Sequence, residues 1–222
     1  MGEEPALGHH PVILSAIVPH WPALSASADG VDEAARVARV EEIFNRHLDA
    51  VWRTARDLGV VPRDLEDVVQ EVMVVCVRRL GDIEAGRERP FLLATTAKVV
   101  ANWRRSRRRR PAEPVESVEE VELHALDRRF GRDSPAAALE HKRDLELVQA
   151  ALEQMTEPQR VAFTLFDIEG LSAREIAEQL GLSEPVVFAR LQRARGVFHR
   201  YVQRHGERNP ESRGPSKSRG QS

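Results

Sequence analysis

Residues 171–195, with the sequence LSAREIAEQLGLSEPVVFARLQRAR, constrain the fold more than any other part of this chain. Ser172 and Glu175 have the spacing of a capping box, which satisfies unpaired backbone N–H groups at the start of a helix. Gly181 suits the left-handed conformation that ends a helix, and Ser183 can cap the helix that follows. The segment therefore predicts two short helices joined by a tight turn at the glycine.

The second of these helices separates apolar residues from basic ones. Val187, Leu191 and Ala194 recur at helical spacing on one face. Arg193 lies on the opposite face, where its side chain can reach a base edge. Phosphate contacts are expected of the flanking arginines, Arg190 and Arg195. The pattern is typical of a helix-turn-helix, whose second helix enters the major groove of DNA. An ordinary helical hairpin is the alternative.

Charge is distributed unevenly ahead of this motif. Residues 98–110 contain seven basic residues and no acid, whereas residues 111–127 contain six acids and no Lys or Arg. The basic run can be a solvated helix end, but its density of arginine favours binding to nucleic-acid phosphates. Trp103 beside the run, and Phe91 further upstream, offer faces on which unpaired bases could stack. For Phe91 we expect a place in the core.

The rest of the chain predicts an all-α fold of two small helical domains joined by a flexible acidic linker. Residues 37–58 repeat apolar side chains at helical spacing, a second helix opens near Asp64, and Pro90 starts a third. Three such helices can bury a core of their own. The predicted divisions are a disordered extension over 1–30, a helical domain over 31–110, the linker over 111–138, the helix-turn-helix domain over 139–204 and a disordered tail over 205–222.

Within the second domain, a helical set begins near Leu139. Thr156 and Gln159 form another capping box, which opens a helix with Val161, Leu165 and Ile168 on its apolar side.

Several functional classes find no support in the sequence. Cys76 is the only cysteine, so an intrachain disulfide is excluded and we expect a small buried apolar residue. A glycine-rich phosphate loop and a nucleophile paired with a base are both missing, so we predict no catalytic residue, metal or cofactor. No segment approaches a transmembrane length. We therefore expect no membrane insertion and a location in the cytoplasm.

Asp67 and Glu71 are four residues apart and share one face of the second predicted helix, together with Gln70. Paired carboxylates can indicate acid–base chemistry or a metal site, but no neighbouring residue supports either. A plain solvated face and a protein-binding surface are the two interpretations that remain.

Three segments together resemble a known family. DLEDVVQEVMVVCVRRL resembles a helix of sigma region 2, and RPFLLATTAKVVANWRRSRRRR resembles the region 2 helix that follows it. LEQMTEPQRVAFTLFDIEGLSAREIAEQLGLSEPVVFARLQRAR is similar to sigma region 4. Their order and spacing match the extracytoplasmic-function sigma factors, over roughly residues 40–202.

The resemblance implies a promoter-specificity subunit of RNA polymerase without a catalytic site of its own. Core polymerase and promoter DNA are the implied partners, and an anti-sigma factor is a further candidate. The implied polymerase-binding residues are Asp67, Gln70, Glu71 and Arg78. Those implied for opening the −10 element are Lys98, Asn102, Trp103, Arg104, Arg105, Arg107 and Arg108. Those implied for reading the −35 element are Ser183, Phe188, Arg190, Gln192, Arg193 and Arg195.

The sequence departs from the family pattern at positions that face DNA. Phe188 stands where Lys is frequent, and Val186 stands where Thr is frequent. Ala97 and Lys98 replace a common Arg-Asn pair, and Asn102 replaces a common Asp. The alternatives are a stand-alone helix-turn-helix regulator, which would bind an operator without polymerase, and a sigma-like adaptor without initiation activity.

Overall fold

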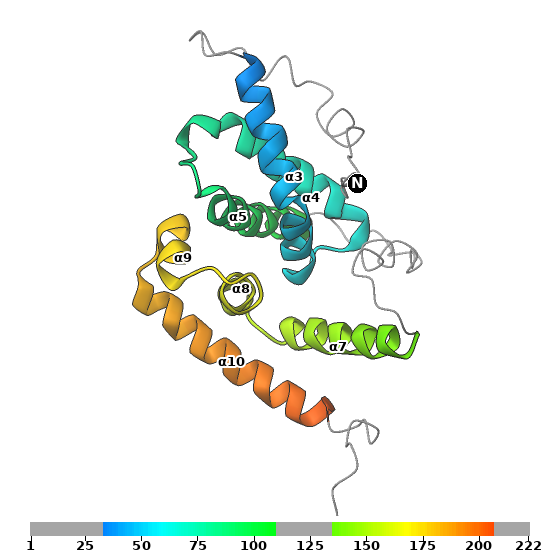
Figure 1. The fold of residues 1–222 in the computed structure, drawn as a ribbon. Helices are drawn as coiled ribbons and strands as arrows, with labels where there is room; N and C mark the ends of the chain where they lie inside the picture. Colours follow the sequence, from blue (N-terminus) through cyan, green and yellow to red (C-terminus); the bar gives the residue numbers. More distant parts are fainter. Residues whose placement is uncertain (1–32, 110–134, 207–222) are drawn as a thin grey trace, which may run out of the picture. The chain divides into compact units, whose positions relative to one another are not determined.

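The computed structural model describes residues 33–109 and 135–206, and every regular element in these ranges is helical (Figure 1). They belong to two compact units. The first unit contains α3 (Glu33–Asp57), α4 (Pro62–Arg78), the short 3-10 helix η1 (Leu80–Asp82) and α5 (Glu88–Arg109). The second contains α7 (Pro135–Glu153), α8 (Glu157–Phe163), the π-helical turn η2 (Thr164–Ile168), α9 (Ala173–Leu180) and α10 (Glu184–Gly206). The all-α prediction is confirmed. The predicted N-terminal extension lies outside the described residues, as do most of the predicted linker and tail.

The first unit is built on the apolar stripe of α4, which packs against α5. Val69, Val72 and Cys76 of α4 are fully buried, as are Leu92 and Leu93 of α5. Each side chain of this size contributes about 1.5–3 kcal/mol when it leaves water completely. The face of α4 opposite this stripe is left to solvent, and it carries the polar residues discussed below.

The second unit is built around α10, which packs against α7, α8 and α9 (Figure 1). Leu152, Met155, Phe163 and Ala194 form a buried cluster. The rings of Phe163 and Phe198 stack on its edge, with their centroids 5.0 Å apart. Offset aromatic stacking adds to the area burial that holds α10 in place. The long helix is therefore fixed along one side, and its other sides remain available.

Four helix ends differ from the predictions. α4 begins at Pro62 rather than near Asp64, and α5 begins at Glu88 rather than at Pro90. A proline is tolerated anywhere in the first turn, because those N–H groups have no partner within the helix. α7 begins at Pro135, so residues 135–138 are helical and do not belong to the linker. α10 continues to Gly206, so residues 205 and 206 are helical and do not belong to the tail.

The predicted apolar face of the helix after Thr156 is partly wrong. The capping box is present, and the Thr156 N–H donates to Gln159 Oε1 at 3.0 Å. Leu165 is buried as predicted, but Ile168 is 37% exposed. The backbone widens into a π-helical turn, in which the Glu169 N–H donates to the Thr164 carbonyl oxygen at 2.9 Å. Such a turn changes the residue spacing, so an α-helical pattern does not hold through Ile168.

The Cys76 thiol is fully buried, and burial raises its pKa to about 12. Alkylating reagents react with the thiolate, which is then scarce at mildly alkaline pH. We expect iodoacetamide to label the native protein very slowly and the denatured protein fully. Mass spectrometry of both samples measures the difference. Rapid labelling of the native protein would show that the α4–α5 core opens readily.

Candidate nucleic-acid interface

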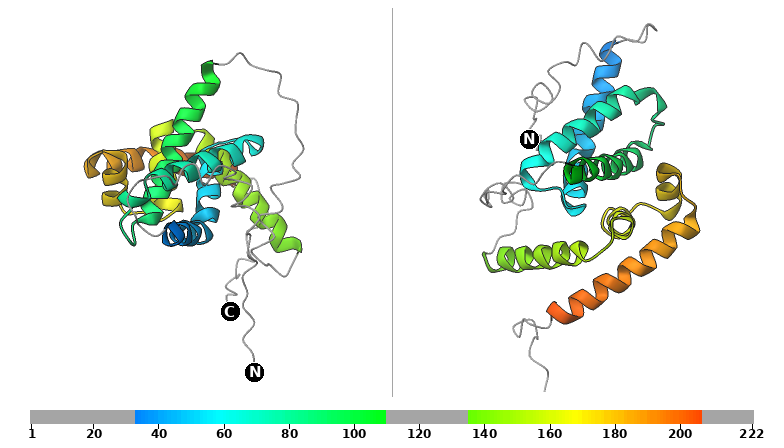
Figure 2. Two further views of the ribbon diagram at one scale, coloured as in Figure 1. Left: turned by 90° about the horizontal axis from the view of Figure 1, so that it is seen from above. Right: turned by 180° about the vertical axis from the view of Figure 1, so that it is seen from behind.

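The predicted helix-turn-helix is formed by α9 and α10, and the right-hand view of Figure 2 shows how α9 leads into the start of α10. The Ser172 N–H donates to Glu175 Oε2 at 2.8 Å, and the Glu175 N–H donates to Ser172 Oγ at 3.2 Å. Gly181 has φ 66° and ψ 40°, in the left-handed region. The Leu182 N–H then donates to the Ala177 carbonyl oxygen at 2.8 Å and closes the turn. The capping box and the glycine turn are both confirmed.

α10 presents its polar residues away from the core. Val187, Leu191 and Ala194 are at most 1% exposed and hold the helix against its unit. Ser183, at the start of α10, lies on the surface, and its carbonyl oxygen accepts from Val186 and Val187. Of the other predicted DNA-binding residues of this helix, Arg190 is partly buried. The rest are exposed, namely Phe188, Gln192, Arg193 and Arg195.

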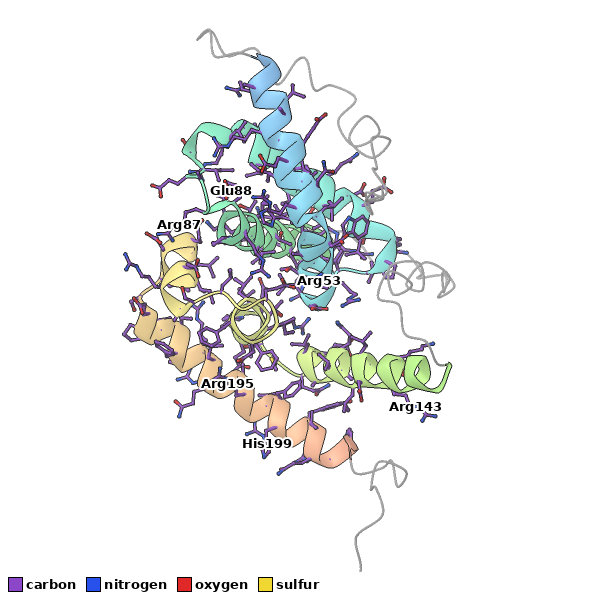
Figure 3. The ribbon with its side chains drawn as sticks, viewed as in Figure 1. Arg53, Arg87, Glu88, Arg143, Arg195 and His199 are labelled. Atoms are coloured by element: carbon purple, nitrogen blue, oxygen red, sulfur yellow. The ribbon has the colours of Figure 1, made fainter. Side chains whose placement is uncertain are left out.

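Arg195, which is labelled in Figure 3, is engaged within its own unit. Its Nε and Nη2 atoms donate to the two carboxylate oxygens of Asp167, at 3.0 and 2.6 Å. Its guanidinium carbon lies 5.4 Å from the centre of the Phe166 ring. The hydrogen bond to Asp167 raises the pKa of Arg195 above its ordinary value. A two-point pair of this kind fixes the orientation of the guanidinium plane.

The end of α5 carries the predicted −10 residues. Lys98, Asn102 and Arg105 are exposed, and Arg105 donates a hydrogen bond to Asn102 Oδ1. Trp103 and Arg104 are partly buried, and Arg108 lies in the helix. The helix therefore gathers these residues at one end of the unit.

Arg107 is held by its own unit. Its Nη1 atom donates to Asp64 Oδ2 of α4 at 2.6 Å, and its guanidinium carbon lies 5.2 Å from the centre of the Trp103 ring. The pair joins the first turn of α4 to the last turns of α5. Sequence reasoning missed Asp64 as a member of this cluster.

The Asp64–Arg107 pair is expected to stabilise the unit only modestly. The two side chains are 22% and 38% exposed, so water screens their attraction. We expect Asp64→Asn and Arg107→Gln each to lower the free energy of unfolding by about 1 kcal/mol or less. A double-mutant cycle by chemical denaturation, at low and high salt, measures their coupling. A coupling energy of zero at low salt would contradict the pairing.

The outer face of α4 brings together the four residues predicted to bind polymerase. Asp67, Glu71 and Arg78 are exposed, and Gln70 is partly buried. The opposite side of the helix is the buried stripe of the core. We call the surface formed by Asp67, Gln70, Glu71 and Arg78 the α4 face.

In residues 33–109 and 135–206, no group of three or more His, Cys, Asp or Glu side chains could hold a metal ion. Within the same ranges, no helix combines the length and apolar character that a membrane crossing requires.

Comparison with known proteins identifies both units. Residues 43–110 match the family model of sigma-70 region 2, and residues 145–196 match that of sigma-70 region 4. The chain is 30% identical over 158 residues to the RNA polymerase sigma factor CnrH of Cupriavidus metallidurans, covering 69% of this chain and 81% of CnrH. It is 28% identical over 196 residues to the ECF RNA polymerase sigma factor SigE of Mycolicibacterium smegmatis, covering 86% of this chain and 72% of SigE.

Solved structures give the same fold. CnrH in complex with the cytosolic domain of CnrY aligns with a TM-score of 0.53 and 26% identity, over 82% of this chain and 97% of CnrH. The sigma factor RpoE from Bartonella quintana, solved with the anti-sigma factor NepR, aligns with a TM-score of 0.56 and 19% identity, over 73% of this chain and 96% of RpoE.

Proposed function

Because this chain belongs to the extracytoplasmic-function sigma factors of the sigma-70 family and serves promoter recognition by RNA polymerase, we propose how its helices divide that task. The observation that carries the proposal is the presence, in one chain, of a capped helix-turn-helix, an arginine-rich helix end and an exposed acidic helix face.

α10 reads the −35 element in the major groove. Its buried side fixes the helix, while Arg193 and Gln192 point away from the core. An arginine on this surface suits the O6 and N7 acceptors of guanine, and a glutamine suits adenine. Arg190, at the side of the helix, suits a phosphate. A phosphate contact fixes the register of the protein on DNA but does not distinguish one base from another.

α5 and the loop before it act on the −10 element. Opening this element requires a base to leave the stack, which costs a few kcal/mol. The exposed Lys98 and Asn102 and the partly buried Trp103 supply charge, hydrogen bonds and an aromatic surface that can offset this cost. Arg107, held by Asp64, acts by keeping Trp103 and the helix end in place.

The α4 face docks on the clamp-helices coiled coil of core polymerase, as the family resemblance implies. Asp67 and Glu71 lie one turn apart and both are exposed. Like charges at this spacing destabilise a helix by about 0.2–0.5 kcal/mol. Basic side chains of a binding partner would attract both carboxylates and offset the repulsion between them. This supports a protein interface rather than a plain solvated face.

An anti-sigma factor is the further protein partner that we propose, and the cytoplasm is the proposed place of action. CnrH was solved with the cytosolic domain of CnrY, and we propose that a comparable anti-sigma factor binds this chain. Nucleotide addition belongs to the polymerase, so the chain itself is a specificity subunit that works in the cytoplasm, where promoters are transcribed.

Polymerase-dependent binding to duplex DNA tests the proposal. Promoter fragments selected with the full chain plus core polymerase are titrated with the full chain alone and with the assembled complex. We expect specific retention only with the complex. Tight operator binding by the chain alone would instead identify a stand-alone regulator, and binding to core without any promoter preference would identify an adaptor.

A further inference from the structure

Phe188 is the most exposed large apolar side chain in the part of the chain that the structure describes. It is 52% exposed in the second turn of α10. It follows the fully buried Val187 by one residue, a rotation of about 100° around the helix. Phe188 therefore lies at the edge of the surface that also carries Gln192, one turn further along. Leaving a ring of this size in water costs free energy that burial in a complex would recover.

The ring of Phe188 is held in place before any partner arrives. It contacts the Phe166 ring edge-on, with centroids 6.4 Å apart and an interplanar angle of 65°. Phe166 is in turn covered by Arg195, whose guanidinium carbon lies 5.4 Å from the ring centre. Arg195 is anchored on Asp167 by the two hydrogen bonds described above. We call this series of contacts, Asp167–Arg195–Phe166–Phe188, the aromatic support.

The net positive charge of α10 points to a polyanion as the partner of this helix. α10 contains five arginines, whereas its single acid is Glu184, in the first turn of the helix. Arg190 and Arg193 lie further around the same helix from Phe188, and they suit phosphates and base edges. In the major groove, the apolar feature that distinguishes one base is the C5-methyl group of thymine, and a phenylalanine can contact it.

We propose that Phe188 is a specificity residue that selects a thymine in the −35 element through the C5-methyl group. Asp167 and Arg195 are positioning residues, because they orient the ring through Phe166. The inference rests on the proposed function and adds one base preference to it. It also gives Arg195 a role other than the phosphate contact expected from its sequence position.

The experiment separates the methyl group from the rest of the base. The full chain with core polymerase selects duplexes from a library randomised at the −35 element. Each enriched thymine is then replaced by deoxyuridine, which keeps the hydrogen-bonding edge and lacks the methyl group. At one enriched position we expect binding to fall about fourfold, which corresponds to about 0.8 kcal/mol per methyl group removed from water.

Variants assign this preference to the ring. The quantity compared is the ratio of the affinity for the thymine duplex to the affinity for the deoxyuridine duplex. Phe188→Ala is expected to reduce this ratio to one, and Phe188→Leu is expected to retain much of the preference. Ile168→Ala removes a similarly exposed apolar side chain outside α10 and is expected to leave the ratio unchanged. A ratio that persists in Phe188→Ala, or a ratio of one at every thymine in the unaltered protein, would overturn the inference.

The aromatic support has its own readout. Asp167→Asn removes a negative charge close to DNA, so a purely electrostatic role predicts tighter binding with an unchanged ratio. Positioning predicts a lower ratio without weaker overall binding, and the same lower ratio in Arg195→Lys, which keeps the charge but loses the planar fork. An unchanged ratio in both variants would remove the positioning role.

Two further outcomes distinguish this inference from the function beneath it. If no −35 sequence is enriched by the unaltered complex, the proposed function fails together with the inference. Phe188→Ala could instead lose affinity for core polymerase while the differences in binding free energy between −35 duplexes persist. The ring would then contact protein rather than thymine, and only the inference would fail.

Discussion

Replacing Asp67 and Glu71 together by alanine is expected to weaken binding to core polymerase by about tenfold or more. Both carboxylates are exposed on the α4 face, and a lost hydrogen bond to a charged group costs about 1.5–3 kcal/mol. The fold should not suffer, because alanine has the highest helix propensity and the substitution removes an unfavourable pair of like charges. Fluorescence titration of core polymerase measures the affinity, and thermal unfolding measures the stability.

A matched variant controls for the loss of charge alone. Glu41→Ala with Asp49→Ala also removes two exposed carboxylates, both of them on α3 rather than on α4. We expect this variant to bind polymerase nearly as well as the unaltered chain. Equal affinities for the two double variants would remove the α4 face from the account.

Arg193→Ala is expected to reduce promoter binding by the assembled complex by about 5- to 150-fold, since a good contact to a base edge is worth about 1–3 kcal/mol. Arg193 is exposed on the side of α10 opposite the buried Val187 and Leu191. Discrimination at one −35 position should relax at the same time. Binding is measured on duplexes that carry each base at each −35 position, over a range of salt concentrations.

The salt series separates two roles for Arg193. A contact to phosphate would weaken all sequences alike and lower the salt slope by about one. Arg143→Ala, which removes an exposed arginine from α7, should change neither the base preference nor the slope. If Arg193→Ala behaves like Arg143→Ala, Arg193 does not contact DNA.

Local chemistry explains why the helix-turn-helix could be predicted. The hydrogen bonds of the Ser172–Glu175 capping box join residues three apart, and Gly181 adopts the left-handed conformation that glycine reaches at no steric cost. The buried stripes of α4 and α10 follow from helical periodicity. Signals of this kind are contained in a few neighbouring residues, and the structure confirms them.

The clusters around the candidate sites could not be predicted in the same way. Asp167 is 28 residues from Arg195, and Asp64 is 43 residues from Arg107. These pairs form because packing brings two helices together, and no local pattern indicates which acid meets which arginine. The π-helical turn between Thr164 and Ile168 shifts the spacing of the helix that carries Asp167. The residues that support the interface are therefore visible only in the folded chain.

Run-off transcription on fragmented genomic DNA tests the central claim most directly. Core RNA polymerase is assayed alone and with the full chain. We expect the added chain to produce new discrete transcripts, whose aligned start sites share −35 and −10 elements. Active core polymerase that yields no new transcript in the presence of folded chain would contradict the account.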